Sequence, residues 1–185
     1  MQIPVTTIDE ALHATAVVPA RSSIFQTFSV WALLGHLAFY GSLFAAPTLA
    51  RLWLLPVVHL MAWAVFVGSH VLVAFYPETM HKPRIAGHDH LHGKSFQILV
   101  GHEVLHVLPL VALYLVPGVW PAHGAFEPTR WLLGSLPGLV LGAAYVAWQG
   151  GEGNAYGAEP GRLNWMIGAS TLAGVSANVA ALLWL

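Results

Sequence analysis

Five histidines and one glutamate lie inside long apolar stretches of the chain, where ionisable side chains are rare because placing them in hydrocarbon is costly. They are His36, His59, His70, His102, Glu103 and His106. The spacing of four residues between His102 and His106 places both on one face of a helix. His59 and His70 also share a face, separated by about 16 Å along the helix axis. Each of these side chains is a candidate for catalysis, ligand binding or hydrogen bonding between helices.

The segment from His102 to His106 matches the pattern H-E-x-x-H, in which two histidines bind zinc and the glutamate acts as general base. Such a site needs a third ligand, and every acidic residue after Glu103 lies in a predicted loop. A second cluster, from His88 to His92, contains three histidines and an aspartate, but the chain has no adjacent His-His pair of the kind that membrane di-iron enzymes use. The sequence therefore predicts no metal site.

Haem is a different possibility, because two histidines on facing membrane helices can serve as its axial ligands. His36, His59 and His70 are the candidate ligands for haem b or a pigment. The protein would then be a subunit of a larger membrane complex for electron transfer. The competing interpretation is that these histidines form hydrogen bonds between helices. Absorption of the purified protein near the Soret region separates ligand binding from other functions.

Nucleophilic catalysis requires a hydroxyl or thiol next to a base. The chain has no cysteine, and Thr27 stands at the start of the first apolar stretch. Paired with an intramembrane histidine, Thr27 could attack a lipid ester. Threonine is also favoured at helix N-caps, so the residue type alone leaves a structural role open.

The composition sets the class of protein in which these side chains act. The chain has 185 residues, of which 57% are apolar and only 8% are charged, and its formal net charge is −1. Soluble domains carry about 25% charged residues, so a soluble enzyme is excluded. A near-neutral chain also lacks the positive field that attracts nucleic acid. Membrane lipids are the expected partners.

Five apolar stretches are about as long as a membrane-spanning helix requires, and they predict an all-α, polytopic membrane helix bundle. They are Thr27–Ala45, Leu52–Tyr76, Phe96–Val116, Trp131–Trp148 and Trp165–Leu185. Residues 1–26 are more polar and are expected to form an interfacial or flexible arm, with 27–185 as the transmembrane domain. Pro109 and Pro137 are expected to kink the helices that contain them.

The distribution of basic residues predicts how the bundle is oriented. Five Lys and Arg residues fall on the N-terminal side of the expected spans, and only Arg51 and Arg130 fall on the other side. Because basic residues concentrate on the cytoplasmic side, a multi-pass protein with a cytoplasmic N-terminus is expected.

Four short segments, in order along the chain, carry a family resemblance. The first is Thr27-Phe28 with Phe39-Tyr40-Gly41, and the second is Ala64–Val67 with the segment Phe75–Pro83. The third runs from His102 to Pro109, and the fourth comprises Tyr145, Trp148 and Asn154–Tyr156. In these places the chain resembles the androgen-induced-protein family of small integral-membrane threonine hydrolases, which cleave esters of hydroxylated fatty acids.

The resemblance implies that Thr27 is the nucleophile and His102 the catalytic histidine, with a lipid ester as substrate and no cofactor. Two departures bear on the histidine. Gly101 occupies a position where the family usually has asparagine, and the distance from the histidine to Val-Leu-Pro is one residue shorter. His106 is therefore the alternative catalytic histidine.

Overall fold

The computed structural model of the chain is entirely helical in the part that it describes, which comprises residues 27–75, 95–122, 127–149 and 160–183. The expected N-terminal arm, 1–26, and the His88–His92 cluster lie outside these residues. The elements are α2 (Phe28–Ala45), α3 (Pro47–Leu49), a π-helical turn (Ala50–Leu54), α4 (Leu55–Phe75), α6 (Ser95–His106), α7 (Leu108–Leu115), α8 (Pro128–Gln149) and α9 (Pro160–Ala181).

Among the described residues, three helical stretches are long and apolar enough to cross a membrane, and they indicate a multi-pass membrane protein. They are Phe28–Ala45, Pro47–Val71 and Pro128–Trp148. These stretches correspond to the first, second and fourth of the five expected spans. The all-α architecture is thus confirmed, whereas the number of spans is supported for three of the five.

The third expected span, Phe96–Val116, is divided into α6 and α7 at Val107. Pro109 explains the break, because it has no amide hydrogen and its ring crowds the carbonyl four residues earlier. Each of the two short helices is therefore shorter than a membrane-spanning helix. Pro137 has a smaller effect, since α8 continues through it from Pro128 to Gln149.

The fifth expected span, Trp165–Leu185, corresponds to α9, which begins at Pro160 and ends at Ala181. Its 22 residues are enough to cross a membrane, but it is not among the three apolar stretches. Polar side chains recur along it, namely Asn164, Ser170, Thr171, Ser176 and Asn178. Asn178 bonds to residues of both α4 and α8 and so joins three helices.

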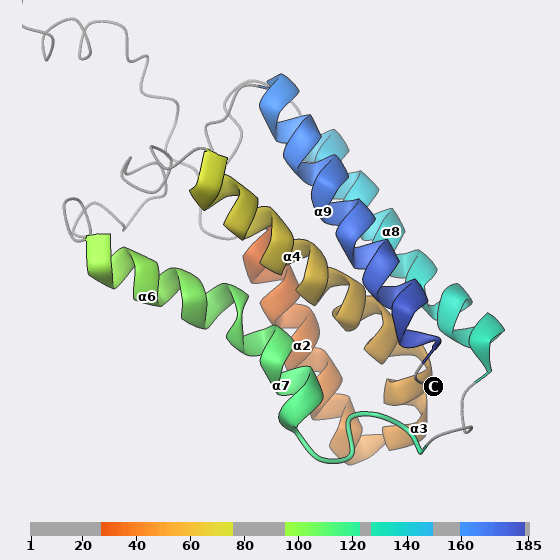
Figure 1. The fold of residues 1–185 in the computed structure, drawn as a ribbon. Coiled ribbons are helices and arrows are strands. Elements are labelled where there is room, and N and C mark those ends of the chain that lie inside the picture. Colours follow the sequence, from red (N-terminus) through yellow and green to blue (C-terminus); the bar gives the residue numbers. More distant parts are fainter. Residues whose placement is uncertain (1–26, 76–94, 123–126, 150–159, 184–185) are drawn as a thin grey trace, which may run out of the picture.

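Helix α4 lies at the centre of the bundle and contacts α2, α6, α7, α8 and α9 (Figure 1). Glycines let two of these neighbours approach closely. A Cβ atom at Gly134 of α8 would lie 2.9 Å from Cγ of Pro56, and one at Gly174 of α9 would lie 2.7 Å from the carbonyl oxygen of Leu60. Small residues at such contacts are the usual means of bringing membrane helices together.

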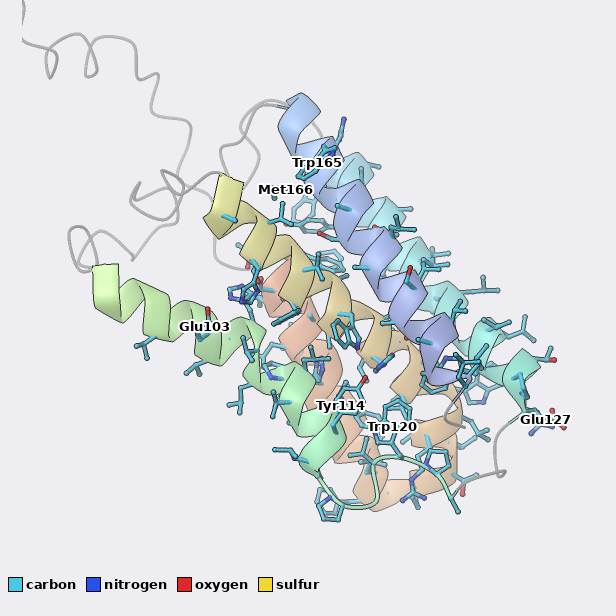
Figure 2. All side chains as sticks on the ribbon, in the orientation of Figure 1. Glu103, Tyr114, Trp120, Glu127, Trp165 and Met166 are labelled. Carbon is cyan, nitrogen blue, oxygen red and sulfur yellow. The ribbon has the colours of Figure 1, made fainter. Side chains whose placement is uncertain are left out.

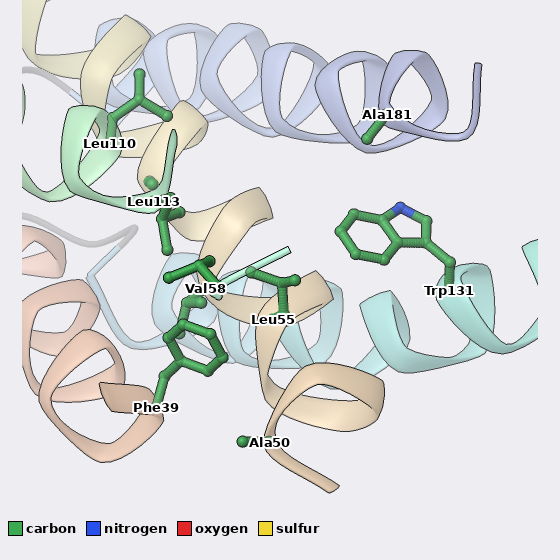
Figure 3. Close-up of a cluster of buried hydrophobic side chains, with 10 residues drawn as sticks. Phe39, Ala50, Leu55, Val58, Leu110, Leu113, Trp131 and Ala181 are labelled. Carbon is green, nitrogen blue, oxygen red and sulfur yellow. The ribbon is translucent and has the colours of Figure 1, made fainter. Parts of the chain in front are cut away.

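Large apolar side chains fill the space between α2, α4, α7 and the ends of α8 and α9 (Figure 3). Phe39, Leu55, Leu113 and Trp131 are completely buried there. Many other large apolar side chains are exposed on the outer faces, including Leu37 and Phe44 of α2, Val140 of α8 and Leu172 of α9. An apolar exterior around buried polar groups is the arrangement that a lipid environment favours.

We predict that Gly174→Ala destabilises the bundle by about 1–3 kcal/mol, because the added methyl group overlaps the backbone of α4. Thermal unfolding in detergent, followed by circular dichroism, measures the effect. Gly168→Ala on the same helix is the matched control, since no atom lies within 4 Å of the added Cβ, and alanine is favoured over glycine in a helix by about 0.5–1 kcal/mol. Equal stability of the two variants would contradict the close α4–α9 contact.

Candidate functional site

Two groups of polar side chains lie between the helices, and each contains histidines singled out from the sequence. His36 and His59 are buried, whereas His70 and His106 are half-buried. His102 lies in α6, and its side chain is outside the part of the structure that is described.

The first group joins the start of α2 to the end of α6 through a hydrogen bond between Ser29 and His106. The Ser29 Oγ and His106 Nε2 atoms are 2.8 Å apart, although the two residues are separated by 77 positions in the sequence. The break at Val107 ends α6 directly after His106. A hydroxyl and an imidazole at this distance have the geometry of a nucleophile and its general base.

Thr27, the nucleophile expected from the resemblance, lies two residues before Ser29. It occupies the N-cap position of α2 with extended backbone angles, φ −87° and ψ 139°, but its side chain makes no capping hydrogen bond. Thr27 is 8% exposed. Threonine at an N-cap is usually explained by the bond from its hydroxyl to the first turn, and that explanation does not apply here.

Glu103 lies one turn before His106 on α6 and pairs with His70 of α4 (Figure 2). The His70 Nε2 and Glu103 Oε2 atoms are 3.6 Å apart, and His70 Nδ1 donates to the carbonyl oxygen of Phe66 at 2.6 Å. Both side chains are partly exposed, 40% for His70 and 44% for Glu103, so this contact between α4 and α6 is not fully buried.

The second group is centred on His59 of α4, which is 1% exposed. Its Nδ1 is 2.5 Å from Oδ1 of Asn178, and its Nε2 is 2.6 Å from the hydroxyl of Tyr114. The Nε1–H of Trp63 also donates toward Nε2, at 3.2 Å. Since the amide oxygen of Asn178 only accepts, the imidazole carries its proton on Nδ1, and Nε2 accepts from the phenol and the indole.

Asn178 of α9 connects this histidine to α8. Its Nδ2 donates to the carbonyl oxygen of Pro56 at 2.9 Å and to Oγ of Ser135 at 2.7 Å. Ser135 donates in turn to the carbonyl oxygen of Trp131 at 2.9 Å. Both ends of the Asn178 amide are thus hydrogen-bonded, and the opposite orientation would place the amide oxygen against the carbonyl oxygen of Pro56, two acceptors face to face.

His36 of α2 differs from the other histidines. Its Nδ1 donates to the carbonyl oxygen of Ala32 at 2.7 Å, whereas its Nε2 is buried without a hydrogen-bond partner among the described residues. The buried hydroxyl of Tyr40, one turn further along α2, also lacks a partner there. Buried polar atoms without protein partners are usually satisfied by water or a ligand.

Several residues of these groups were not identified from the sequence, among them Ser29, Tyr114 and Asn178. The sequence analysis considered Thr27 and not Ser29, although two hydroxyl residues two positions apart at a helix start make either one a candidate nucleophile. Tyr114 resembles any aromatic residue in an apolar stretch. Asn178 is the residue of the three that the sequence could most easily have indicated, because an amide in an apolar stretch needs hydrogen-bond partners.

Among the residues that the structure describes, no three His, Asp or Glu side chains gather closely enough to hold a metal ion. The resemblance found in the sequence has no counterpart in comparisons with known proteins: no family model, no curated protein and no solved structure matches this chain.

Proposed function

We propose that this protein is an integral-membrane hydrolase of fatty-acid esters that uses a hydroxyl at the start of α2 as nucleophile and an intramembrane histidine as base. The observation that carries the proposal is the 2.8 Å hydrogen bond between Ser29 Oγ and His106 Nε2. A serine or threonine hydroxyl is a weak nucleophile near neutral pH and needs such a neighbour.

In this mechanism Ser29 Oγ attacks the carbonyl carbon of the ester while its proton moves to His106 Nε2. The tetrahedral intermediate then loses the alcohol, which receives that proton from His106. Water attacks the resulting acyl-enzyme in the same way, releasing the fatty acid and restoring the serine. Ser29 is the second residue of α2, and the amides at a helix start favour the negative charge that develops on the carbonyl oxygen.

The surroundings of the Ser29–His106 pair support a lipid substrate. Val104, Leu105 and Leu108, which flank His106 along the chain, are exposed apolar residues. In a bilayer such residues face the acyl chains, so an ester can reach the half-buried pair from the lipid. Membrane lipids and a lipid ester are thus the proposed partners, and the basic residues support a cytoplasmic N-terminus.

Thr27 remains the alternative nucleophile, and His102 the alternative base, because the resemblance to the androgen-induced-protein family implies these two residues. Thr27 is buried two positions from Ser29 and does not use its side chain as a cap. Both hydroxyls therefore lie at the start of the same helix, and covalent labelling can distinguish them.

A fluorophosphonate probe tests the proposal, because activated hydroxyls displace its fluoride and remain covalently bound. We expect one labelled residue, Ser29 or Thr27, in the purified protein, identified by mass spectrometry, and loss of labelling in His106→Ala. Ser42, near the other end of α2, is the matched hydroxyl and should remain unlabelled. Labelling that is absent, or that is unchanged in His106→Ala, would refute the use of His106 as base.

A second candidate function is favoured by the hydrogen bonds of His36 and His70. Each donates from Nδ1 to the carbonyl oxygen four residues earlier, which is how histidines that bind metals are commonly oriented. The buried, unpaired Nε2 of His36 fits an axial ligand of haem b. By contrast, both nitrogens of His59 already have partners. His70 Nε2 lies 3.6 Å from Glu103, so His36 is the histidine that favours this function. A Soret band in the purified protein would favour this function, as a subunit of a larger membrane complex.

A further inference from the structure

The cluster around His59 has no part in the proposed hydrolysis, yet it places the phenol of Tyr114 in hydrogen-bond contact with the imidazole of His59. Tyr114 of α7 donates its hydroxyl proton to His59 Nε2 at 2.6 Å. Tyr114 is 51% exposed as a residue, whereas His59 is 1% exposed. Tyr114, labelled on α7 in Figure 2, thus combines a surface that molecules in the lipid can reach with a hydroxyl group bonded to a buried imidazole.

The protonation state of His59 prepares it to accept the phenol proton. Its Nδ1–H is held by Oδ1 of Asn178, so the lone pair of Nε2 points to Tyr114. After a proton transfer, Nε2–H would donate back to the tyrosine oxygen and Nδ1–H would keep its bond to Asn178. Only the Nε1–H of Trp63 changes its acceptor, from His59 Nε2 to the tyrosine oxygen, which also lies 3.2 Å away.

Two tryptophans extend the aromatic system from Tyr114 into the bundle. The rings of Tyr114 and Trp120 are stacked with centroids 5.5 Å apart, and those of Trp120 and Trp131 are stacked at 5.6 Å. The Nε1–H of Trp120 donates to the carbonyl oxygen of Leu113 at 2.8 Å, which fixes the indole against α7. A radical formed on Tyr114 therefore lies beside further aromatic rings that can exchange an electron with it.

We propose that Tyr114 and His59 form a redox site in which Tyr114 is oxidised by one electron and its phenolic proton moves to His59 Nε2. The products are a neutral tyrosyl radical and an imidazolium. The electron is taken by a one-electron oxidant that reaches α7 from the lipid, namely a peroxyl radical of an acyl chain, which becomes a hydroperoxide by taking a proton from water. The site would act as a phenolic reductant of lipid radicals, independently of ester hydrolysis.

The experiment uses the full chain in lipid nanodiscs and photogenerated ruthenium(III) tris-bipyridine as the one-electron oxidant. Electron paramagnetic resonance of freeze-quenched samples detects the tyrosyl radical. We expect the radical in the wild type, its loss in Tyr114→Phe and slower formation in D2O than in H2O. Tyr114→Phe keeps the ring that stacks on Trp120. Tyr40→Phe, which removes a buried phenol without a partner in the described residues, is the control and should keep the signal.

His59→Gln separates proton acceptance from hydrogen bonding, because a glutamine oxygen can accept the phenol hydrogen bond but is not a base. We expect loss of the tyrosyl signal in this variant, with helix content retained. A signal of wild-type size in Tyr114→Phe or in folded His59→Gln would overturn the proposal. If His59→Gln does not fold, equal rates in H2O and D2O for the wild type would overturn it.

Discussion

Hydrolysis of a fatty-acid ester by the reconstituted protein is expected to fall by about 10²–10⁴-fold in His106→Ala, the range that positioned general bases contribute. The reason is that His106 Nε2 is the acceptor 2.8 Å from Ser29 Oγ, and without it the hydroxyl keeps its proton during attack. Release of a fluorescent fatty acid from an ester in proteoliposomes measures the rate. Ser29→Ala is expected to reduce the rate by a similar factor if Ser29 is the nucleophile.

Three further variants test whether the loss of activity comes from the missing base and which hydroxyl is the nucleophile. His106→Gln keeps a hydrogen-bonding group but not a base, so it should be as inactive as His106→Ala. Ser42→Ala, on the same helix as Ser29, should retain wild-type activity. Thr27→Ala decides between the two hydroxyls, since activity that survives Ser29→Ala but not Thr27→Ala assigns the nucleophile to Thr27. Full activity in His106→Ala would exclude His106 as the base.

The helices could largely be predicted from the sequence, because apolar stretches and prolines act locally. The first, second and fourth expected spans coincide closely with helical stretches, and the break between α6 and α7 lies two residues before Pro109. The third and fifth expected spans are not among the stretches that are long and apolar enough to cross a membrane. The stretch that contains Pro109 is long enough only if its two helices are counted as one, and α9 carries polar residues that serve packing within the bundle.

The inward position of the histidines could be predicted from the cost of exposing them to lipid, and the burial of His36 and His59 agrees with it. The hydrogen-bond partners of these histidines could not be predicted from the sequence. Spacing within a helix says which residues share a face, but the contact between Ser29 and His106 depends on how α2 packs against α6. The same holds for His59, whose partners come from α7 and α9.

Asn178→Leu is expected to destabilise the bundle strongly. Leucine has a similar size but leaves the buried Nδ1–H of His59 unpaired, and an unsatisfied buried donor costs about 1–3 kcal/mol. It also removes the donors to Pro56 and Ser135. Unfolding in detergent, followed by tryptophan fluorescence, measures the free-energy difference. Asn164→Leu, at an exposed position of the same helix, is the matched control and should change stability little.

The double variant His59→Leu/Asn178→Leu tests whether the loss comes from the hydrogen bond or from packing. Replacing both partners by apolar groups leaves no unpaired donor between them, and such exchanges can be nearly neutral. We therefore expect the double variant to be more stable than the sum of the two single effects predicts, since residues in direct contact are coupled. Strictly additive effects would mean that the 2.5 Å contact between His59 and Asn178 does not stabilise the bundle as a hydrogen bond. In that case the contribution of Asn178 would come from its bonds to Pro56 of α4 and Ser135 of α8.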